Sequence, residues 1–296
     1  MRPPGNPRTQ EGANRMTPLL HISDLHFGRN KTTNDEAHAA IDGILSRWGG
    51  GTPKPIVVVT GDVVQDGESD QYDLARAEVG RLRAAGFEVF LVPGNHDYGR
   101  MGSHAQAKRF VLFKEAFYPH RLVAYPDVVK RDGWTLIGLN SMKAECGFFD
   151  GLLADGELGA DQISDTNLVL RQLQEERRAG KTKLVVYLHH HPFVFPDKTL
   201  FQQLGEWATH SLKDGADLMH KISGLADVVL FGHDHRAWDF SHPLAGRVLT
   251  SEYQIPVILS CGTTSGVDDV TQRPGPREAW LLEWQAAAPV VTRVLL

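Results

Sequence analysis

Short apolar runs alternate with amphipathic segments along the first third of the chain. Two of these segments carry apolar residues at helical spacing and predict helices at 34–48 and 69–85. The runs around them are rich in Leu, Ile, Val and Phe, and they predict buried strands at 19–23, 56–60 and 87–92. Strands that alternate with helices in this way favour a parallel sheet covered by helices.

The remaining sequence adds strands and helices in a less regular order. A strand around 128 and another at 134–140 flank the Asp132-Gly133 pair, which predicts an antiparallel hairpin. Further helices are predicted at 104–117, 162–178 and 212–224. Further strands are predicted at 183–188 and 226–231, and near 247, 257, 280 and 291. We interpret 17–296 as one α/β domain with a parallel first part and an antiparallel last part, preceded by a disordered tail at 1–16.

Composition removes several classes of protein. A hydrophobic fraction of 42% with 23% charged residues is typical of globular chains and argues against a disordered or coiled-coil protein. A net charge of -5 does not favour nucleic acid as a partner. The apolar runs are much shorter than the roughly 18 residues that a membrane helix needs. Two distant cysteines form no disulfide framework, so we expect a cytoplasmic location without membrane association.

Histidine and aspartate gather where the predicted strands end. Seven of the 14 histidines lie in five short loops, at 24–26, 61–62, 94–97, 189–191 and 232–235. Core packing does not explain such a concentration, because imidazoles are usually spread over surfaces and interfaces. The carboxyl ends of strands in α/β sheets converge on one crevice, so residues that are distant in sequence can meet there.

These side chains are suited to a catalytic metal site. Imidazole and carboxylate ligands fit zinc, manganese or iron, and no cysteine lies in the loops to form a structural thiolate site. Seven donors are too many for one tetrahedral ion, which favours two ions about 3.5 to 4 Å apart that share a carboxylate, with Asp62 as the bridge. We expect Asp24 and His26, and likewise His233 and His235, to project from one side of extended segments.

The ordered motifs DLH, GD, GNHD, HHH and GHDH resemble those of the calcineurin-like metallophosphoesterases, over residues 24–235. Within that superfamily the chain looks most like the bacterial class III cyclic-nucleotide phosphodiesterase branch. The resemblance implies a four-layer αββα sandwich of two mixed β-sheets flanked by helices. It also implies two divalent or mixed-valence ions of Mn, Fe or Zn. The implied first-ion ligands are Asp24, His26, Asp62 and His235. The implied second-ion ligands are Asp62, Asn95, one histidine of 189–191, and His233.

The resemblance makes His96 the catalytic residue beside the phosphate and leaves two points open. Many relatives carry an aspartate three residues after the bridging one, but position 65 is Gln here and the aspartate is Asp66. Asp97 is then an alternative partner for His96, although a role in the turn is equally consistent with its position. Among the three histidines we prefer His189 as the ligand because it directly ends an apolar run, while His190 remains open.

The expected activity is hydrolysis of a small phosphodiester, such as a cyclic nucleotide, by a hydroxide held between the two ions. Phosphomonoesterase or nuclease activity at the same site is the first alternative. A non-catalytic binding module on this fold is the second. The C-terminal strands could form the edge of a homodimer or complete a sheet, and no sequence feature separates these cases.

Overall fold

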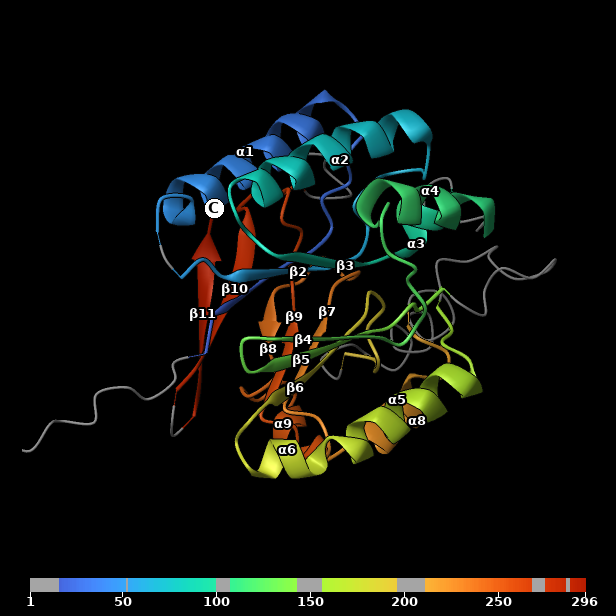
Figure 1. Ribbon diagram of the computed structural model, residues 1–296, viewed down its shortest axis with the longest axis vertical. Helices are drawn as coiled ribbons and strands as arrows, with labels where there is room; N and C mark the ends of the chain where they lie inside the picture. Colours follow the sequence, from blue (N-terminus) through green and yellow to red (C-terminus); the bar gives the residue numbers. More distant parts are fainter. Residues whose placement is uncertain are drawn as a thin grey trace, which may run out of the picture.

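Two β-sheets pack face to face, and helices cover the outer face of each (Figure 1). The computed structural model describes residues 16–51, 53–99, 107–142, 156–195, 211–267, 275–285 and 288–296. This arrangement is the predicted four-layer αββα sandwich. Apart from Met16, the predicted tail at 1–16 lies outside the described residues. No helix of the described part is both long enough and apolar enough to span a bilayer.

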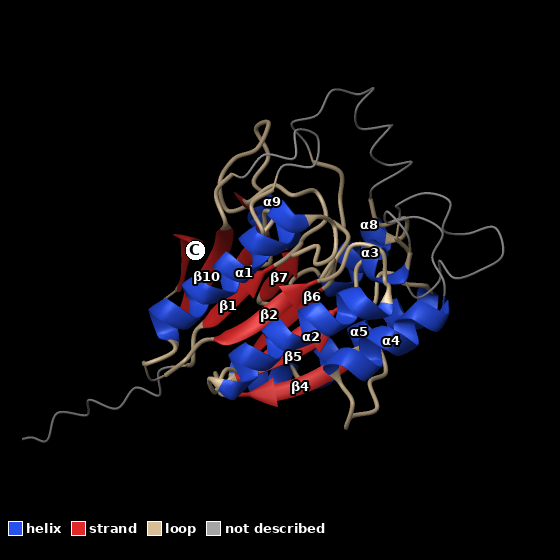
Figure 2. Cartoon of the chain, turned by 90° about the horizontal axis from the view of Figure 1, so that it is seen from above, coloured by secondary structure: helices blue, strands red, loops and turns tan. Residues whose placement is uncertain are grey.

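The first sheet has the order β11-β10-β1-β2-β3. Its strands are β1 (Leu19–Ile22), β2 (Ile56–Thr60), β3 (Val89–Val92), β10 (Glu278–Trp284) and β11 (Pro289–Leu295). The first three are parallel, whereas β10 pairs antiparallel with β1 and with β11. Its helices are α1 (Lys31–Trp48), α2 (Ser69–Ala84), α3 (Asn95–Tyr98) and α4 (Ala107–Phe117). Figure 2 shows α1 and α2 lying over the strands of this sheet.

The second sheet has the order β4-β5-β6-β7-β9-β8. Its strands are β4 (Asp127–Arg131), β5 (Trp134–Gly138), β6 (Lys183–Tyr187), β7 (Val228–Phe231), β8 (Trp238–Asp239) and β9 (Val257–Ser260). The four central strands are parallel, and β4 and β8 are antiparallel edges. Its helices are α5 (Ala160–Gln172), α6 (Gln174–Arg178), α8 (Gly215–Ile222) and α9 (Leu249–Tyr253). The hairpin through Asp132 and Gly133 is as predicted.

The strands are apolar on both faces because each sheet lies between two layers. On β2, Val57 and Val59 pack in the cluster beneath the helices. Ile56 and Val58, which point the other way, pack in the cluster between the two sheets. A third cluster fills the space between the second sheet and its helices. A continuous apolar run such as IVVVT is therefore a strand buried on both sides.

Several predicted boundaries were wrong for local reasons. The first helix begins at Lys31 because the Asn30 side chain accepts the backbone N–H of Thr33 and caps it. Helix α2, by contrast, begins at Ser69 as predicted and ends one residue early, at Ala84. The segment at 162–178 divides into α5 and α6 at Leu173.

The region after β7 also differs from the prediction. The segment near 247 forms an isolated bridge followed by helix α9 rather than a strand. The two-residue strand β8 was not predicted, because it is too short to show periodicity. The last two strands pair antiparallel, as predicted. They extend the first sheet, with β10 beside β1 and β11 at the edge.

Candidate metal centre

Loops from both sheets meet at one edge of the sandwich, where parallel strands end. The first sheet contributes the residues after β1, β2 and β3, and the second sheet contributes those after β6 and β7. The Nε2 atoms of His26 and His235 lie 3.1 Å apart although the residues are 209 positions apart in sequence. The structure thus brings together all seven predicted ligands, namely Asp24, His26, Asp62, Asn95, His189, His233 and His235.

Three of these residues form the first group of donors. The Nε2 atom of His235 lies 3.2 Å from Oδ1 of Asp24, and that oxygen lies 3.9 Å from Nε2 of His26. Asp24 is fixed by its second oxygen, which accepts the backbone N–H of His233 at 3.2 Å. Asp24 and His26 are buried, whereas the His235 side chain is partly exposed, so the group is reached from the side of His235.

The second group forms around His189. Its Nε2 atom lies 2.9 Å from Oδ1 of Asn95 and 3.1 Å from Nδ1 of His233. Oδ2 of Asp62 lies 3.2 Å from the same nitrogen and 4.0 Å from Nε2 of His26. Asp62 therefore stands between the two groups, which is the position expected of a bridging ligand.

The atoms of the second group fit a bound cation. Nδ1 of His189 donates to the carbonyl of Thr60 at 2.7 Å, so in the neutral ring Nε2 carries a lone pair. That lone pair faces the oxygens of Asp62 and Asn95, which are acceptors too. Ligands that bind one ion at 2.0–2.1 Å lie about 3 to 3.4 Å apart, close to the distances from His189 in the second group and from His235 in the first. A metal ion satisfies all these acceptors at once.

The buried carboxylates and imidazoles of the centre shift one another's pKa, and a metal ion bound at His189 would displace the proton that Asp62 favours there. Burial opposes ionisation of Asp62, but the charges of His189 and His96 outweigh it and hold the pKa of Asp62 below its usual range. Burial also lowers the pKa of His26 to about 3, so its ring is neutral and can bind a metal. Burial of His189 works in the same direction, yet the neighbouring Asp62 carboxylate raises the pKa of His189 to about 9.

The ligand loops are not extended, contrary to the sequence prediction. Positive backbone φ angles occur at Asp24 (57°), His26 (51°), Asp62 (49°), His233 (74°) and His235 (52°). Left-handed backbone at residues other than glycine costs about 1 to 3 kcal/mol each and gathers at functional sites. Both members of each Asp-x-His or His-x-His pair still face the centre, but they do so through tight turns.

Two glycines allow the loops to approach each other closely. A Cβ atom on Gly94 would lie 2.2 Å from Oδ1 of Asp62. A Cβ atom on Gly232 would lie 2.0 Å from the Ser23 hydroxyl oxygen and 2.6 Å from Oδ2 of Asp24. Neither contact is tolerable, so the glycine of GNHD and that of GHDH are required by the packing of the centre.

A backbone carbonyl orients His96. Its Nδ1 atom lies 2.7 Å from the carbonyl oxygen of Gln65 and donates to it, since a carbonyl can only accept. A donor atom of His96 lies within 4.8 Å of those of His26 and Asp62. The backbone N–H of His96 donates to Oδ1 of Asp62 at 2.9 Å, which ties the histidine loop to the bridging residue.

Neither predicted carboxylate partner of His96 has that role. The Asp66 carboxylate accepts from the Gln71 side chain at 3.1 Å. Asp97 accepts the backbone N–H groups of Gly94 (2.9 Å), Val63 (3.3 Å) and Val64 (3.1 Å). Asp97 is buried and its carboxylate links the loop of Asp62 to the loop of His96. This is a structural role in the turn, the second of the two roles that the sequence left open.

The three consecutive histidines have different surroundings. His189 lies within the second group, whereas Nδ1 of His190 pairs with the Ser141 hydroxyl at 2.7 Å. The ring of His190 also lies against that of His233, with centroids 4.4 Å apart. His191 pairs with the carbonyl of Phe193 at 2.8 Å. Of the three, only His189 lies within hydrogen-bond distance of both Asp62 and Asn95, while donor atoms of His189, His190 and His233 lie within 4.8 Å of one another.

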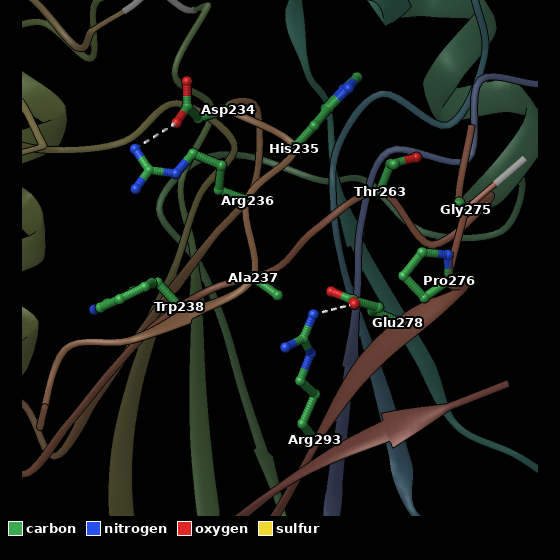
Figure 3. Close-up of a pocket in the computed structure, with 11 residues that line it drawn as sticks. Asp234, His235, Arg236, Ala237, Trp238, Thr263, Gly275, Pro276, Glu278 and Arg293 are labelled. Atoms are coloured by element: carbon green, nitrogen blue, oxygen red, sulfur yellow. Dashed lines mark hydrogen bonds and ion pairs between the residues drawn. The ribbon is translucent and has the colours of Figure 1, made fainter. Parts of the chain in front are cut away.

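A cavity of about 580 Å³ opens beside the first group (Figure 3). It is lined by His235 itself and by residues of β10 and β11, including Glu278 and Arg293. Sequence reasoning did not single out these two residues. In the sequence they are two charged residues in largely apolar predicted strands. Their position beside the metal centre cannot be predicted until β10 is known to pair with β1.

Three comparisons place the chain among known proteins. The sequence profile of the calcineurin-like phosphoesterases matches residues 17–237. A segment of 86 residues, 27% of this chain, is 37% identical to the glycerophosphodiester phosphodiesterase GpdQ of Enterobacter lignolyticus (strain SCF1). That match spans only 29% of the relative's own length. It agrees with the expected bacterial phosphodiesterase branch.

Two solved structures share the fold. Purple acid phosphatase PPD1 from yellow lupin (Lupinus luteus) seeds matches with a TM-score of 0.61 and 14% identity, over 95% of this chain and 51% of the phosphatase. GAP50, the anchor in the inner membrane complex of Plasmodium, matches with a TM-score of 0.60 and 10% identity. That match covers 95% of this chain and 85% of GAP50.

Proposed function

Because the chain belongs to the calcineurin-like phosphoesterase family, we propose that it is a metal-dependent hydrolase of phosphodiesters. The observation that carries the proposal is the convergence of seven nitrogen and oxygen donors from both sheets around Asp62. The phosphodiesterase relative and the cavity beside His235 support the choice of a diester. A diester has a second ester group that needs space next to the reacting phosphate, whereas a monoester has none.

Two ions fit the two groups. Asp24, His26, Asp62 and His235 would hold the first ion, and Asp62, Asn95, His189 and His233 the second. Manganese, iron and zinc all suit such ligands, including as a mixed-valence pair. When bound, such a pair lowers the pKa of a coordinated water and offsets charge on the phosphate oxygens.

His96 supplies the proton chemistry. Its Nδ1–H is held by the Gln65 carbonyl, so Nε2 is the atom left to act on the substrate. When protonated, Nε2 can donate to a phosphate oxygen or to the departing alkoxide, a contribution of typically ~10²- to 10⁴-fold. The carbonyl of Gln65 keeps the ring in this orientation, and Asp62 fixes the backbone of the same loop. A small diester, such as a cyclic nucleotide, is the proposed substrate.

The test uses manganese-loaded protein with bis(4-nitrophenyl) phosphate and 4-nitrophenyl phosphate. Asp62→Asn removes the shared carboxylate, and Asp66→Asn makes the same chemical change in the same loop at a residue that pairs with Gln71. We expect higher turnover on the diester, loss of both turnover and bound metal in Asp62→Asn, and little change in Asp66→Asn. Bound metal is measured by elemental analysis.

Each other outcome contradicts part of the proposal. Metal-loaded protein without turnover on either ester would favour a binding module. Preference for the monoester would assign a phosphatase. Equal losses in the two variants would show that the Asp62 carboxylate has no special position.

A further inference from the structure

A cavity of about 290 Å³ lies at the opposite end of β3 from the metal centre. It is lined from β3 and β4, which are edge strands of the two sheets, and it shares no lining residue with the metal centre. Val89 at the start of β3 lines the cavity, whereas Asn95 and His96 follow the end of that strand. With a rise of about 3.3 Å per residue, β3 alone separates the two sites by about 10 Å.

Three arginines and one glutamate are the charged residues that line the cavity. Arg131 pairs with Glu88 at 2.6 Å, and Arg121 pairs with Asp127, which does not belong to the lining. Arg83 has no carboxylate partner among the residues that the structure describes. The cavity therefore carries one positive charge in excess, which favours a ligand with one negative charge.

Arg83 holds this charge together with most of its hydrogen-bond donors. A guanidinium has five N–H groups, and in the described part of the chain this one makes a single hydrogen bond, to the carbonyl of Val89 at 3.3 Å. Burial lowers the pKa of Arg83 below its usual value, because the charge has lost part of its hydration. The remaining N–H groups lie in one plane and match the two oxygens of a carboxylate.

The apolar part of the lining is mainly aromatic and buried, and it includes Phe87, Phe90 and Tyr118. The Arg131 guanidinium lies 6.0 Å from the centre of the Phe90 ring, and that of Arg121 lies 5.6 Å from the centre of the Tyr118 ring. The Tyr118 hydroxyl is bonded to the backbone N–H and C=O of Leu91. These walls therefore offer a ligand apolar surface, and the arginines offer it hydrogen bonds.

Charge and size together define the class of ligand. A cation would meet a surplus of guanidinium groups, and a phosphate with two charges would meet the nearby carboxylates of Glu88 and Asp127. The volume lies at the lower limit of the about 300 to 1,000 Å³ of small-molecule pockets. We propose that this cavity binds a small aromatic monocarboxylate, with its carboxylate on Arg83 and its ring against the aromatic walls. This site is separate from the proposed function.

The experiment titrates the metal-loaded protein with benzoate in a calorimeter and repeats the titration after a chelator has removed the metal. We expect saturable binding with the same Kd in both states, because the cavity and the metal centre share no residue. Benzamide has the shape of benzoate without its charge, and acetate has the charge without the ring. We expect each of them to bind at least about tenfold more weakly than benzoate.

Arg83→Gln removes the charge and keeps a donor for the carbonyl of Val89. We expect it to raise the Kd for benzoate at least about tenfold. Arg76→Gln is the matched control, since Arg76 lies on the same helix, pairs with Asp73 at 2.7 Å and does not line the cavity. The second variant, Val129→Phe, fills the cavity from β4 and leaves Arg83 in place, so it should abolish binding.

The opposite results would overturn the proposal in distinct ways. Absence of saturable binding overturns it outright, and binding that disappears with the metal assigns benzoate to the metal centre instead. Equal affinity for benzamide contradicts the role of the charge, and equal affinity for acetate contradicts that of the aromatic walls. Tighter binding of phenylphosphonate than of benzoate by the metal-free protein would assign the cavity to phosphorus compounds. An unchanged Kd in both Arg83→Gln and Val129→Phe would place the ligand elsewhere.

Discussion

Replacing Gly94 by alanine probes how closely the loops of the metal centre approach each other. The backbone of Gly94 has φ −106° and ψ −176°, which alanine adopts without strain, so the effect of the added methyl group is purely steric. That methyl carbon would lie 2.2 Å from Oδ1 of Asp62, about 1.2 Å closer than the 3.4 Å at which ordinary van der Waals contact begins. Asp62 and the Gly94 loop must therefore separate by about an ångström.

A displacement of this size is large for a catalytic centre. Oδ1 of Asp62 is bound to the backbone N–H of His96 at 2.9 Å, and Oδ2 lies 3.2 Å from Nε2 of His189. A misplacement of about 1 Å can cost about 10²-fold in rate. We expect Gly94→Ala to lower kcat/KM by at least that factor and to weaken metal binding, because the shared ligand moves.

The matched control is Gly80→Ala. Gly80 lies within α2, and a Cβ atom there meets nothing within 4 Å. Alanine should stabilise the protein by about 0.8 to 1 kcal/mol through helix propensity and leave activity unchanged. The assays are diester turnover, metal content per folded protein, and thermal unfolding followed by circular dichroism. A Gly94→Ala protein with full metal content and turnover within threefold of wild type would refute the close approach of the two loops.

Three further predictions separate chemistry, metal binding and stability. His96→Ala should lower kcat by ~10²- to 10⁴-fold while both ions remain bound, because its side chain supplies a proton and not a required ligand; loss of metal together with activity would contradict this role. Removing the metal with a chelator should lower the unfolding temperature, since free metal at about 100 times its Kd stabilises a one-site protein by about 2.7 kcal/mol; an unchanged temperature in calorimetry would argue against a metal centre. Asp227→Ala should cost about 3 to 5 kcal/mol in denaturant unfolding, because Asp227 holds Arg177 at 3.0 Å and the backbone N–H of Leu184 at 2.9 Å; its turnover per folded molecule should equal that of the wild type.

The sequence predicts the parts of the fold that local pattern determines. Runs such as IVVVT at 56–60 identify buried strands by composition, and the Asp132-Gly133 turn identifies its hairpin. The partner of β1 is different, because β10 lies more than 250 residues later and no local pattern records that pairing. The two-residue strand β8 and helix α9 are too short for a reliable period.

In the candidate site, too, local sequence predicts some features and not others. Side chains that bind metals can be read from residue type and position after a strand, and all seven predicted ligands lie together in the structure. The group that orients His96 could not be predicted, because it is the carbonyl of Gln65 and every residue has a carbonyl. The left-handed backbone at Asp24 and Asp62 could not be predicted either, because aspartate does not require that conformation.

The pairing of β1 with β10 has a consequence for the order of events during synthesis. Leu19 of β1 lies opposite Leu282 of β10. About 260 residues must therefore be synthesised after β1 before its partner strand β10 is available. At about 5 to 20 residues per second, one edge of β1 waits roughly 13 to 50 s for its partner. An unpaired apolar edge can recruit other chains during that interval. Early chains therefore carry the loops of Asp24 and Asp62 on a sheet that still lacks β10 and β11.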